Sequence, residues 1–249
     1  MRFETARMCK LGGREDNQDF ADFVVLKKRK LGCWAVADGL GGHRGGGIAA
    51  KLAVEEILRS FKQDPRCTPE ALYKYLSDAN REIVSFQEEN LRYSRMRTTV
   101  AVLVSDFQSM LWAHLGDTRF YHFREGKVMF QTLDHSVSQA RVSEGEITSD
   151  QVRYHEDRTR LLKTLGQHGT FRPQVQKETI PIQPNDAFLL CTDGFWEYIE
   201  EREMEIDYTH ASTPRKWIMS MEKRILKRAG EESDNYTAIG VYFSTGKKK

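Results

Sequence analysis

Apolar residues along this chain recur at two different spacings, which divide the sequence into predicted strands and predicted helices. Short, largely apolar runs are typical of strands. They cover residues 3–10, 21–26, 31–37, 98–104, 110–115, 119–123, 127–131, 187–191 and 236–243. Steps of three and four, typical of one helix face, occur over residues 48–61 and after residues 68 and 213. Strands and helices come in blocks, which favours an α+β fold over an alternating parallel sheet.

Two of the three helices have clear start signals. Thr68-Pro69 and Thr213-Pro214 each place a capping hydroxyl before proline, the residue suited to the first helical position. Glu125-Gly126 lies between two strand-like runs and predicts a hairpin turn. Residues 132–180 are polar and irregular, and long segments of this kind often carry function.

Length and charge narrow the class of protein. A chain of 249 residues suits one large domain. Its 38 Lys and Arg against 36 Asp and Glu leave a net charge of +2, without the basic footprint of a nucleic-acid-binding protein. The N-terminus lacks a signal peptide's apolar core and the apolar runs are too short to span a bilayer, so we expect no membrane association. The four cysteines form no C-x-x-C pair, which indicates free thiols and a cytoplasmic location.

Three aspartates at predicted strand ends point to a metal centre. Asp38 follows the apolar run 33–36 and precedes a glycine-rich stretch; Asp193 follows the run 187–191, and Asp234 precedes the last strand. Carboxylates are the hard oxygen ligands that suit Mg²⁺ or Mn²⁺. A single Asp-Gly is usually only a turn, but three such acids favour a shared site. The sequence has neither H-E-x-x-H nor a Cys/His cluster, which argues against zinc.

The glycine-rich stretch also suggests a nucleotide-binding loop, and the spacing argues against it. A dinucleotide-binding fingerprint beginning at Gly39-Leu40-Gly41 needs glycine at position 44, which is Arg44. A P-loop needs Gly-Lys-Ser/Thr, which is missing here.

The acids belong to an ordered series of motifs that resembles the metal-dependent protein phosphatases, the PPM or type 2C serine/threonine family. The matching segments are residues 14–19, 37–43, 96–99, 116–119, 133–136, 190–197 and 233–237. Each is a weak signal alone, but their order along almost the whole chain is specific. Leu40, after Asp38-Gly39, makes the series similar to that of the bacterial branch.

The resemblance implies a central β-sandwich of two mostly antiparallel sheets flanked by helices. It also implies a single domain over residues 1–249, with a flap-like insertion near residues 134–180. We expect this domain to be a monomer.

The resemblance further implies two Mn²⁺ or Mg²⁺ ions, with a third in bacterial members, and a set of ligands. Asp38 would bridge two ions, the Gly39 carbonyl would bind one, and Asp193 and Asp234 would hold the other. Asp19 would act through bound water, and Asp117 would join Asp193 at the third ion. Gln18 stands where many members carry Glu, a loss of charge that predicts weaker metal affinity.

The implied reaction is hydrolysis of phosphoserine and phosphothreonine in proteins by a hydroxide between the metals. Arg14 and Asp38 would be catalytic, with Arg14 holding the substrate phosphate because its fork fits phosphate oxygens. The partners would be phosphorylated substrates of a serine/threonine kinase. Ser136, at the start of the flap, is either a substrate contact or a helix cap. His135 is better explained as a loop histidine than as a ligand, and His43 as a residue at a helix start.

A non-enzymatic alternative is a pseudophosphatase that binds phosphopeptides without cleaving them. The presence of Arg14, Asp38, Asp193 and Asp234 argues against it, because a missing ligand is what would favour it. Leu40 occupies the position where animal-type members carry a candidate proton-donating histidine, so we expect water to protonate the leaving oxygen.

Overall fold

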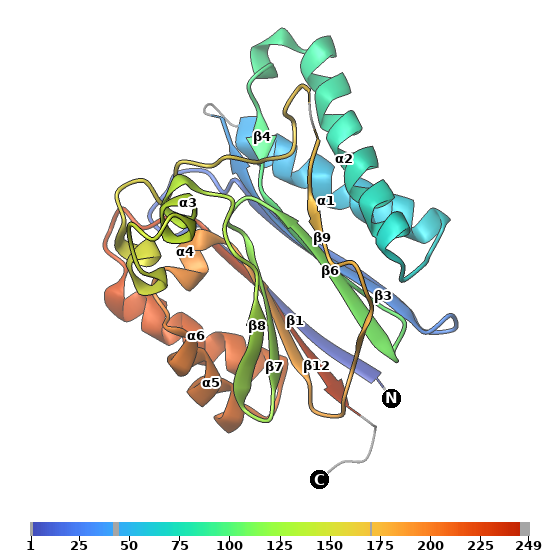
Figure 1. The fold of residues 1–249 in the computed structure, drawn as a ribbon, viewed down its shortest axis with the longest axis vertical. Helices are drawn as coiled ribbons and strands as arrows, with labels where there is room; N and C mark the ends of the chain where they lie inside the picture. Colours follow the sequence, from blue (N-terminus) through green and yellow to red (C-terminus); the bar gives the residue numbers. More distant parts are fainter. Residues whose placement is uncertain (1, 42–44, 170, 245–249) are drawn as a thin grey trace.

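The computed structural model describes residues 2–41, 45–169 and 171–244, and it consists of two stacked β-sheets with helices on both outer faces (Figure 1). The strands are β1 (Arg2–Lys10), β2 (Asp19–Leu26), β3 (Leu31–Leu40), β4 (Arg97–Thr98), β5 (Val100–Ser105), β6 (Ser109–Leu115), β7 (Arg119–Arg124), β8 (Lys127–Gln131), β9 (Gln174–Val175), β10 (Ile180–Pro181), β11 (Ala187–Cys191) and β12 (Tyr236–Ser244). The α-helices are α1 (Gly45–Gln63), α2 (Pro69–Glu89), α3 (Val137–Ser143), α4 (Asp193–Trp196), α5 (Glu201–His210) and α6 (Pro214–Arg228), joined by the 3₁₀-helices η1 (Leu91–Tyr93) and η2 (Ser149–Tyr154).

Every described strand pair is antiparallel. One sheet has the order β1-β12-β11-β7-β8, and the other has the order β10-β6-β5-β3-β2, with β4 beside β3 and β9 beside β6. Helices α1 and α2 cover the second sheet, and α5 and α6 cover the first (Figure 1). The predicted α+β sandwich is confirmed.

The alternation of side chains along the strands builds three apolar layers. In β3, Cys33 and Ala35 pack with α1 and α2, while Trp34 and Val36 point into the space between the sheets. This is the two-residue period of a strand with both faces covered. A third layer packs the first sheet against α4, α5 and α6, and it includes the buried Trp217.

The predicted helix starts and the hairpin turn are confirmed. The Thr68 side chain accepts a hydrogen bond from the Ala71 backbone at 3.3 Å, and Thr213 accepts one from Lys216 at 3.2 Å. Glu125 and Gly126 have φ angles of 51° and 81°, the pair of positive values that a tight hairpin between β7 and β8 requires.

Two regions differ from the sequence prediction. Residues 132–180 contain more structure than their irregular pattern indicates, because α3 and η2 form there and β9 and β10 return to pair with β6. Helix α5 was not predicted, because it buries only Met204 and Asp207 and so has almost no apolar stripe. Its available signal was the capping box between Glu200 and Glu203.

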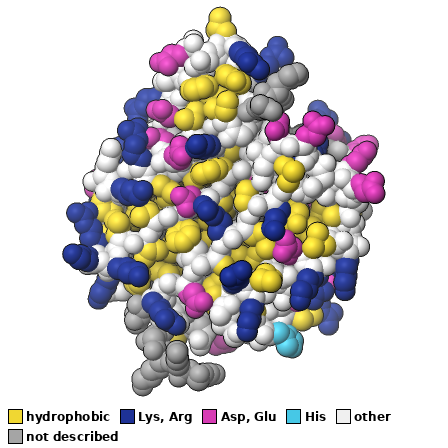
Figure 2. All heavy atoms as spheres, turned by 180° about the vertical axis from the view of Figure 1, so that it is seen from behind, with side chains coloured by type: hydrophobic (Ala, Val, Ile, Leu, Met, Phe, Trp, Pro, Cys, Tyr) yellow, Lys and Arg dark blue, Asp and Glu magenta, His cyan; other side chains and the backbone are white. Residues whose placement is uncertain are grey.

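The distribution of charge on the described surface agrees with the near-equal numbers of basic and acidic residues in the sequence. On the face seen in Figure 2, positive, negative and apolar side chains are interspersed. Among the described helices, none has both the length and the apolar character needed to cross a membrane.

Candidate metal centre

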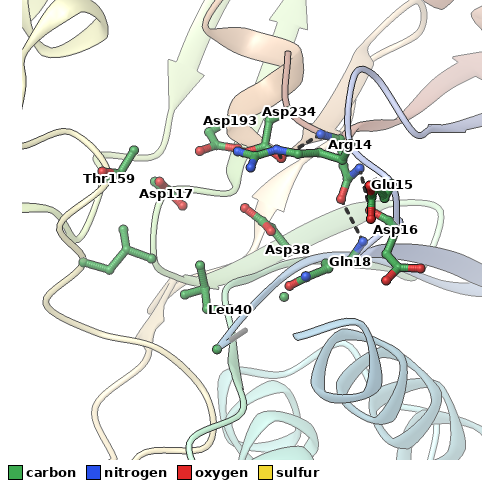
Figure 3. A pocket seen from close by; sticks show the side chains of 14 residues that line it. Arg14, Glu15, Asp16, Gln18, Asp38, Leu40, Asp117, Thr159, Asp193 and Asp234 are labelled. Carbon is green, nitrogen blue, oxygen red and sulfur yellow. Dashed lines mark hydrogen bonds and ion pairs between the residues drawn. The ribbon is translucent and has the colours of Figure 1, made fainter. Parts of the chain in front are cut away.

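A cavity of about 550 Å³ opens where strand ends from both sheets meet, and the predicted acids surround it (Figure 3). Its lining comprises Arg14, Glu15, Asp16, Gln18, Asp38, Gly39, Leu40, Gly41, Asp117, Thr159, Leu161, Asp193, Asp234 and Asn235. Four of the aspartates predicted as metal ligands line it, namely Asp38, Asp117, Asp193 and Asp234. They come from four separate segments of the chain, so only the folded protein brings them together.

Hydrogen bonds to the backbone of Asp38 fix this residue near the end of β3. Its carbonyl accepts hydrogen bonds from the Thr98 hydroxyl at 2.7 Å and from the Thr99 backbone N–H at 2.8 Å. Asp38 is also paired with Asp19 across β2 and β3. The backbone at Asp38 is therefore fixed from two sides, while its carboxylate points into the cavity (Figure 3).

Gly39 permits a close approach between β3 and the first turn of α1. A Cβ atom at Gly39 would lie 2.0 Å from the Gly46 carbonyl oxygen and 2.7 Å from that of Gln18. The Gly39 N–H donates to the Gln18 carbonyl at 3.1 Å. The glycines after Asp38 therefore serve backbone packing beside the cavity. His43, between Gly39 and Gly46 in sequence, lies outside the described residues.

Asp193 and Asp234 are brought together by the adjacent strands β11 and β12. Asp193 is the first residue of α4, and its Oδ1 accepts a hydrogen bond from the Gly194 N–H at 2.6 Å. The Asp234 Oδ1 likewise accepts one from the Asn235 N–H at 2.8 Å. A Cβ atom at Gly194 would lie 2.1 Å from the Asn235 carbonyl oxygen, so glycine is required where these segments meet.

Asp117 lies in the turn between β6 and β7. Its Oδ1 is buried and has no hydrogen-bond partner within the described structure. A buried carboxylate oxygen without a donor is costly unless a cation or ligand satisfies it.

The electrostatics of the cavity disfavour several negative charges at once. Burial raises the pKa of Asp38 well above its usual value, and the charges of Asp193, Asp19 and Asp117 raise it further. The pKa of Asp193 is raised well above its usual value by burial and by Asp117. Burial also raises the pKa of Asp19 and of Asp117 to about 7. Cations in the cavity would relieve this repulsion.

The chemistry of this donor set fits a hard divalent cation. The cavity offers carboxylates, the Gly39 backbone and the unpartnered oxygen of Asp117. Within residues 2–41, 45–169 and 171–244, however, no three His, Cys, Asp or Glu side chains form a ready-made cluster for one ion. Water molecules and backbone carbonyls would therefore have to complete each coordination shell, as is usual for Mg²⁺.

Arg14 lies at the cavity as predicted, but its guanidinium is paired with an acid. Its Nε and Nη2 donate to the two carboxylate oxygens of Asp234 at 3.1 and 2.9 Å (Figure 3). This pairing raises the pKa of Arg14. Both partners are about half exposed, with side-chain exposures of 56% and 46%, so solvent screens the pair and the fork can exchange partners.

Two predicted site residues do not line the cavity. Asp19 is 5% exposed and accepts a hydrogen bond from the Thr192 hydroxyl at 2.9 Å, and its action on an ion through bound water stays a prediction. Ser136 is 1% exposed, and its hydroxyl accepts a hydrogen bond from the Gln139 N–H as the cap of α3. This corrects the prediction of a substrate-binding Ser136: the side chain is occupied and has no access to solvent.

His135 also has a structural explanation. Its ring stacks on His114 with centroids 4.4 Å apart, and its Nδ1 accepts a hydrogen bond from the Gly116 N–H at 3.2 Å. Burial, then the neighbouring His114, lowers the pKa of His135 to about 3. The imidazole is therefore a neutral packing group, in agreement with the sequence interpretation.

Three residues at the cavity were missed by the sequence analysis. Asn235 accepts a hydrogen bond from the Gln18 N–H at 2.8 Å and donates to the carbonyls of Leu11 and Asp16, which fixes the loop that carries Arg14. Its place beside Asp234 was the available signal. Thr159 and Leu161 reach the lining from the flap segment, and no pattern in the sequence marks them.

Comparisons with known proteins agree with this geometry. A family model described as protein phosphatase 2C matches residues 12–229. The serine/threonine phosphatase stp of Listeria monocytogenes serotype 4b is 31% identical over 199 residues, covering 78% of this chain and 74% of the relative.

Solved structures share the fold. The Mycobacterium tuberculosis serine/threonine phosphatase PstP/Ppp superposes with a TM-score of 0.86 at 22% identity, covering 98% of this chain and 100% of the other. The PstP catalytic domain in complex with two manganese ions gives a TM-score of 0.83 at 22% identity, covering 97% and 98%. The family model and the Listeria relative, together with the four-aspartate cavity, confirm the predicted family: the chain belongs to the protein phosphatase 2C family.

Proposed function

We propose that this protein hydrolyses phosphoserine and phosphothreonine in other proteins with the help of Mn²⁺ or Mg²⁺. The observation that carries the proposal is the convergence of Asp38, Asp117, Asp193 and Asp234 on one cavity that also contains Arg14. Acids without enough counter-charge suit cations, and a guanidinium suits a phosphate. The serine/threonine phosphatases among the relatives support the same activity.

The proposed metal-binding residues follow the family resemblance and all line the cavity. Asp38 would bridge two ions, with the Gly39 carbonyl at one of them and Asp193 and Asp234 at the other. A third ion would use Asp117 and Asp193. When bound, such ions supply positive charge to the phosphoryl oxygens and lower the pKa of a coordinated water. The PstP complex with two manganese ions supports the use of Mn²⁺.

Arg14 would bind the phosphoryl group of the substrate. Its fork now faces Asp234, and an ion at that carboxylate would compete for the same oxygens. The released guanidinium could then donate two parallel hydrogen bonds to phosphate oxygens and neutralise charge that develops in the transition state. Asn235 holds the backbone on both sides of Arg14, so the guanidinium stays near the cavity.

The leaving oxygen has no obvious side-chain donor at the position after Gly39. Leu40 lines the cavity and cannot provide a proton. We therefore assign protonation of the serine or threonine oxygen to water.

The substrates would be phosphoproteins produced by serine/threonine kinases, and the enzyme would act as a monomer formed by one domain. The described cysteines are all free, which supports a cytoplasmic location. The comparisons give no support to the pseudophosphatase alternative, since the relatives reported are named as phosphatases.

The test is phosphate release from a phosphothreonine peptide by the metal-stripped protein. Mn²⁺ should restore activity, and excess chelator should remove it. Asp22→Asn, at a half-exposed acid that does not line the cavity, serves as a control for nonspecific effects of removing a carboxylate. Full activity in excess chelator, or none with Mn²⁺, would refute the proposal.

A further inference from the structure

Trp196 does not line the cavity, but it contacts or neighbours in sequence two of the acids that do, Asp117 and Asp193. It is the last residue of the short helix α4, whose first residue is Asp193. Its indole Nε1 donates a hydrogen bond to the backbone carbonyl of Asp117 at 2.9 Å. Trp196 is therefore linked to Asp193 through the backbone of α4, and it is linked to the turn that carries Asp117 through a hydrogen bond.

The turn that carries Asp117 depends on such external contacts. Gly116 has a φ of 92°, and a Cβ atom there would lie 2.5 Å from the Thr99 side chain. On the other side of Asp117, the Thr118 hydroxyl lies 2.5 Å from that of Thr99. The Thr99 contacts fix the two neighbours of Asp117, and the indole fixes the carbonyl of Asp117 itself. The carboxylate has no such restraint at Oδ1.

A buried ion pair packs against the face of the Trp196 indole. The Arg119 guanidinium lies over the Trp196 ring, 3.4 Å from its centroid. Arg119 is fixed by a fork to Asp134, with both N–O distances at 2.8 Å and both side chains almost fully buried. A planar cation held in this way fixes the plane of the ring and the direction of its N–H.

A second contact ties the indole residue to the flap. Arg153 of η2 donates a hydrogen bond to the Trp196 carbonyl and pairs with Glu201 at 2.8 Å. Asp134, which holds Arg119, is the residue at which the flap segment begins. Trp196 thus lies where the flap, α4 and the β6–β7 turn meet.

We propose that Trp196 is a positioning residue that sets the spacing of Asp117 and Asp193 at the metal centre. This inference rests on the proposed function, because it assigns the two acids to a shared ion. Carboxylates that share an ion must be held to within a fraction of an ångström, and this needs support from residues behind them. Loss of the indole N–H should loosen the Asp117 turn and weaken Mn²⁺ binding there, without removing any ligand.

Trp196→Phe is the informative variant, because it keeps an aromatic ring for Arg119 and removes only the N–H donor and part of the ring. Trp217→Phe is its matched control. Trp217 is also fully buried, and its Nε1 donates to a backbone carbonyl, that of Met204 at 3.1 Å, but Met204 does not line the cavity. The two substitutions remove the same atoms and the same kind of hydrogen bond.

The experiment is calorimetric titration of Mn²⁺ into four metal-stripped proteins: wild type, Asp117→Ala, Trp196→Phe and Trp217→Phe. Asp117→Ala identifies the binding that depends on that acid. Trp196→Phe should weaken the same binding by roughly two- to tenfold, the equivalent of one neutral hydrogen bond. Trp217→Phe should bind Mn²⁺ as wild type does, while both tryptophan variants lose similar thermal stability without metal.

Each contrary result has a distinct meaning. Equal Mn²⁺ binding by Trp196→Phe and Trp217→Phe would overturn the positioning role of Trp196. Unchanged binding by Asp117→Ala would overturn it as well, since no ion would depend on that acid, but would leave a centre at Asp38, Asp193 and Asp234 intact. If the wild-type protein bound no Mn²⁺, the proposed function itself would fail.

Discussion

Asp186 and Asp117 are both buried aspartates beside strands of the same sheet, at 1% and 4% exposure, and their surroundings are opposite. Arg124 forks onto both carboxylate oxygens of Asp186 at 2.8 Å, and the Gln183 N–H donates to it as well. Although burial raises the pKa of Asp186, the contacts with Arg124, His122 and the Gln183 backbone together outweigh burial and hold the pKa below its usual value. Asp117 has an oxygen without a partner and a pKa raised to about 7, first by burial and then by Asp134.

The difference separates an acid that stabilises the fold from one that is available to a ligand. The fork between Arg124 and Asp186 ties the end of β7 to the segment before β11. Asp117, Asp38 and Asp193 instead lie together at the cavity. The protein supplies too few positive charges and hydrogen-bond donors there to balance their three carboxylates. Perturbed acids that line a cavity are characteristic of functional sites.

The largest expected effect is the loss of catalysis when Asp38 or Asp193, two acids of the cavity, is replaced. Asp38→Asn or Asp193→Asn should lower kcat by on the order of a thousandfold or more, because each removes a proposed metal ligand and its charge. The fold should persist, and the metal-free variants should unfold at the same or a higher temperature, because repulsion between the acids is relieved. Steady-state kinetics at saturating Mn²⁺ would measure this. Near-normal turnover in either variant would remove that aspartate from the site.

Asp186→Ala should have the reverse effect. It leaves the Arg124 guanidinium without its buried partner, which typically costs about 3–5 kcal/mol of unfolding free energy. Denaturant unfolding would measure the loss, and kcat/KM per folded molecule should not change. Asp22→Ala is the matched control, because its ion pair with Arg7 is about half exposed and should be worth about 0–1 kcal/mol. Equal losses in the two variants would contradict the assigned role of Asp186.

Arg14→Ala should mainly raise KM for small phosphate esters. Loss of a charge-assisted contact to phosphate should cost about 1.5–3 kcal/mol in kcat/KM. Arg14→Lys keeps the charge and loses the fork, so it should recover only part of the activity. Altered stability with unchanged kinetics would make Arg14 a purely structural partner of Asp234.

A further prediction concerns stability alone: the free energy of unfolding of the metal-free protein should depend on pH. Asp19 and Asp117 have pKa values of about 7 in the folded protein, against a usual value of 3.8. The folded state therefore binds more protons than the unfolded state between these values, so stability should fall as pH rises from about 4 to 7. We expect the free energy of unfolding to fall over this range, and to fall less in Asp117→Asn. Stability that rises with pH over this range would contradict the raised values.

The sequence was enough to predict the parts of the molecule that repeat local patterns. The apolar run of β3 and the Thr-Pro starts of α2 and α6 specify those elements because the relevant signals lie within a few residues. The aspartates at strand ends could be nominated for the same reason, since each follows or precedes an apolar run. Their shared context favoured a common site, but the role of each ligand could be inferred only from the family resemblance.

Contacts between distant segments could not be predicted. The Ser-x-x-Gln spacing from Ser136 to Gln139 is a local capping signal, and the structure shows that Ser136 caps α3, but the spacing alone does not show whether the side chain also faces the cavity. The pairing of Arg14 with Asp234 joins residues 220 positions apart. The same holds for the hydrogen bond from Trp196 to Asp117, which depends on how α4 packs against the β6–β7 turn.

The most direct test of the account is whether Mn²⁺ binding displaces protons from the aspartates at the cavity whose pKa values are raised. Calorimetric titration of metal-stripped protein at pH 6.5, in buffers of different ionisation enthalpy, measures both the binding and the protons released. The account predicts saturable binding with net proton release, because acids with raised pKa values must ionise to hold the ion. Binding without proton release, or no binding, would contradict the claim that these aspartates form a metal centre.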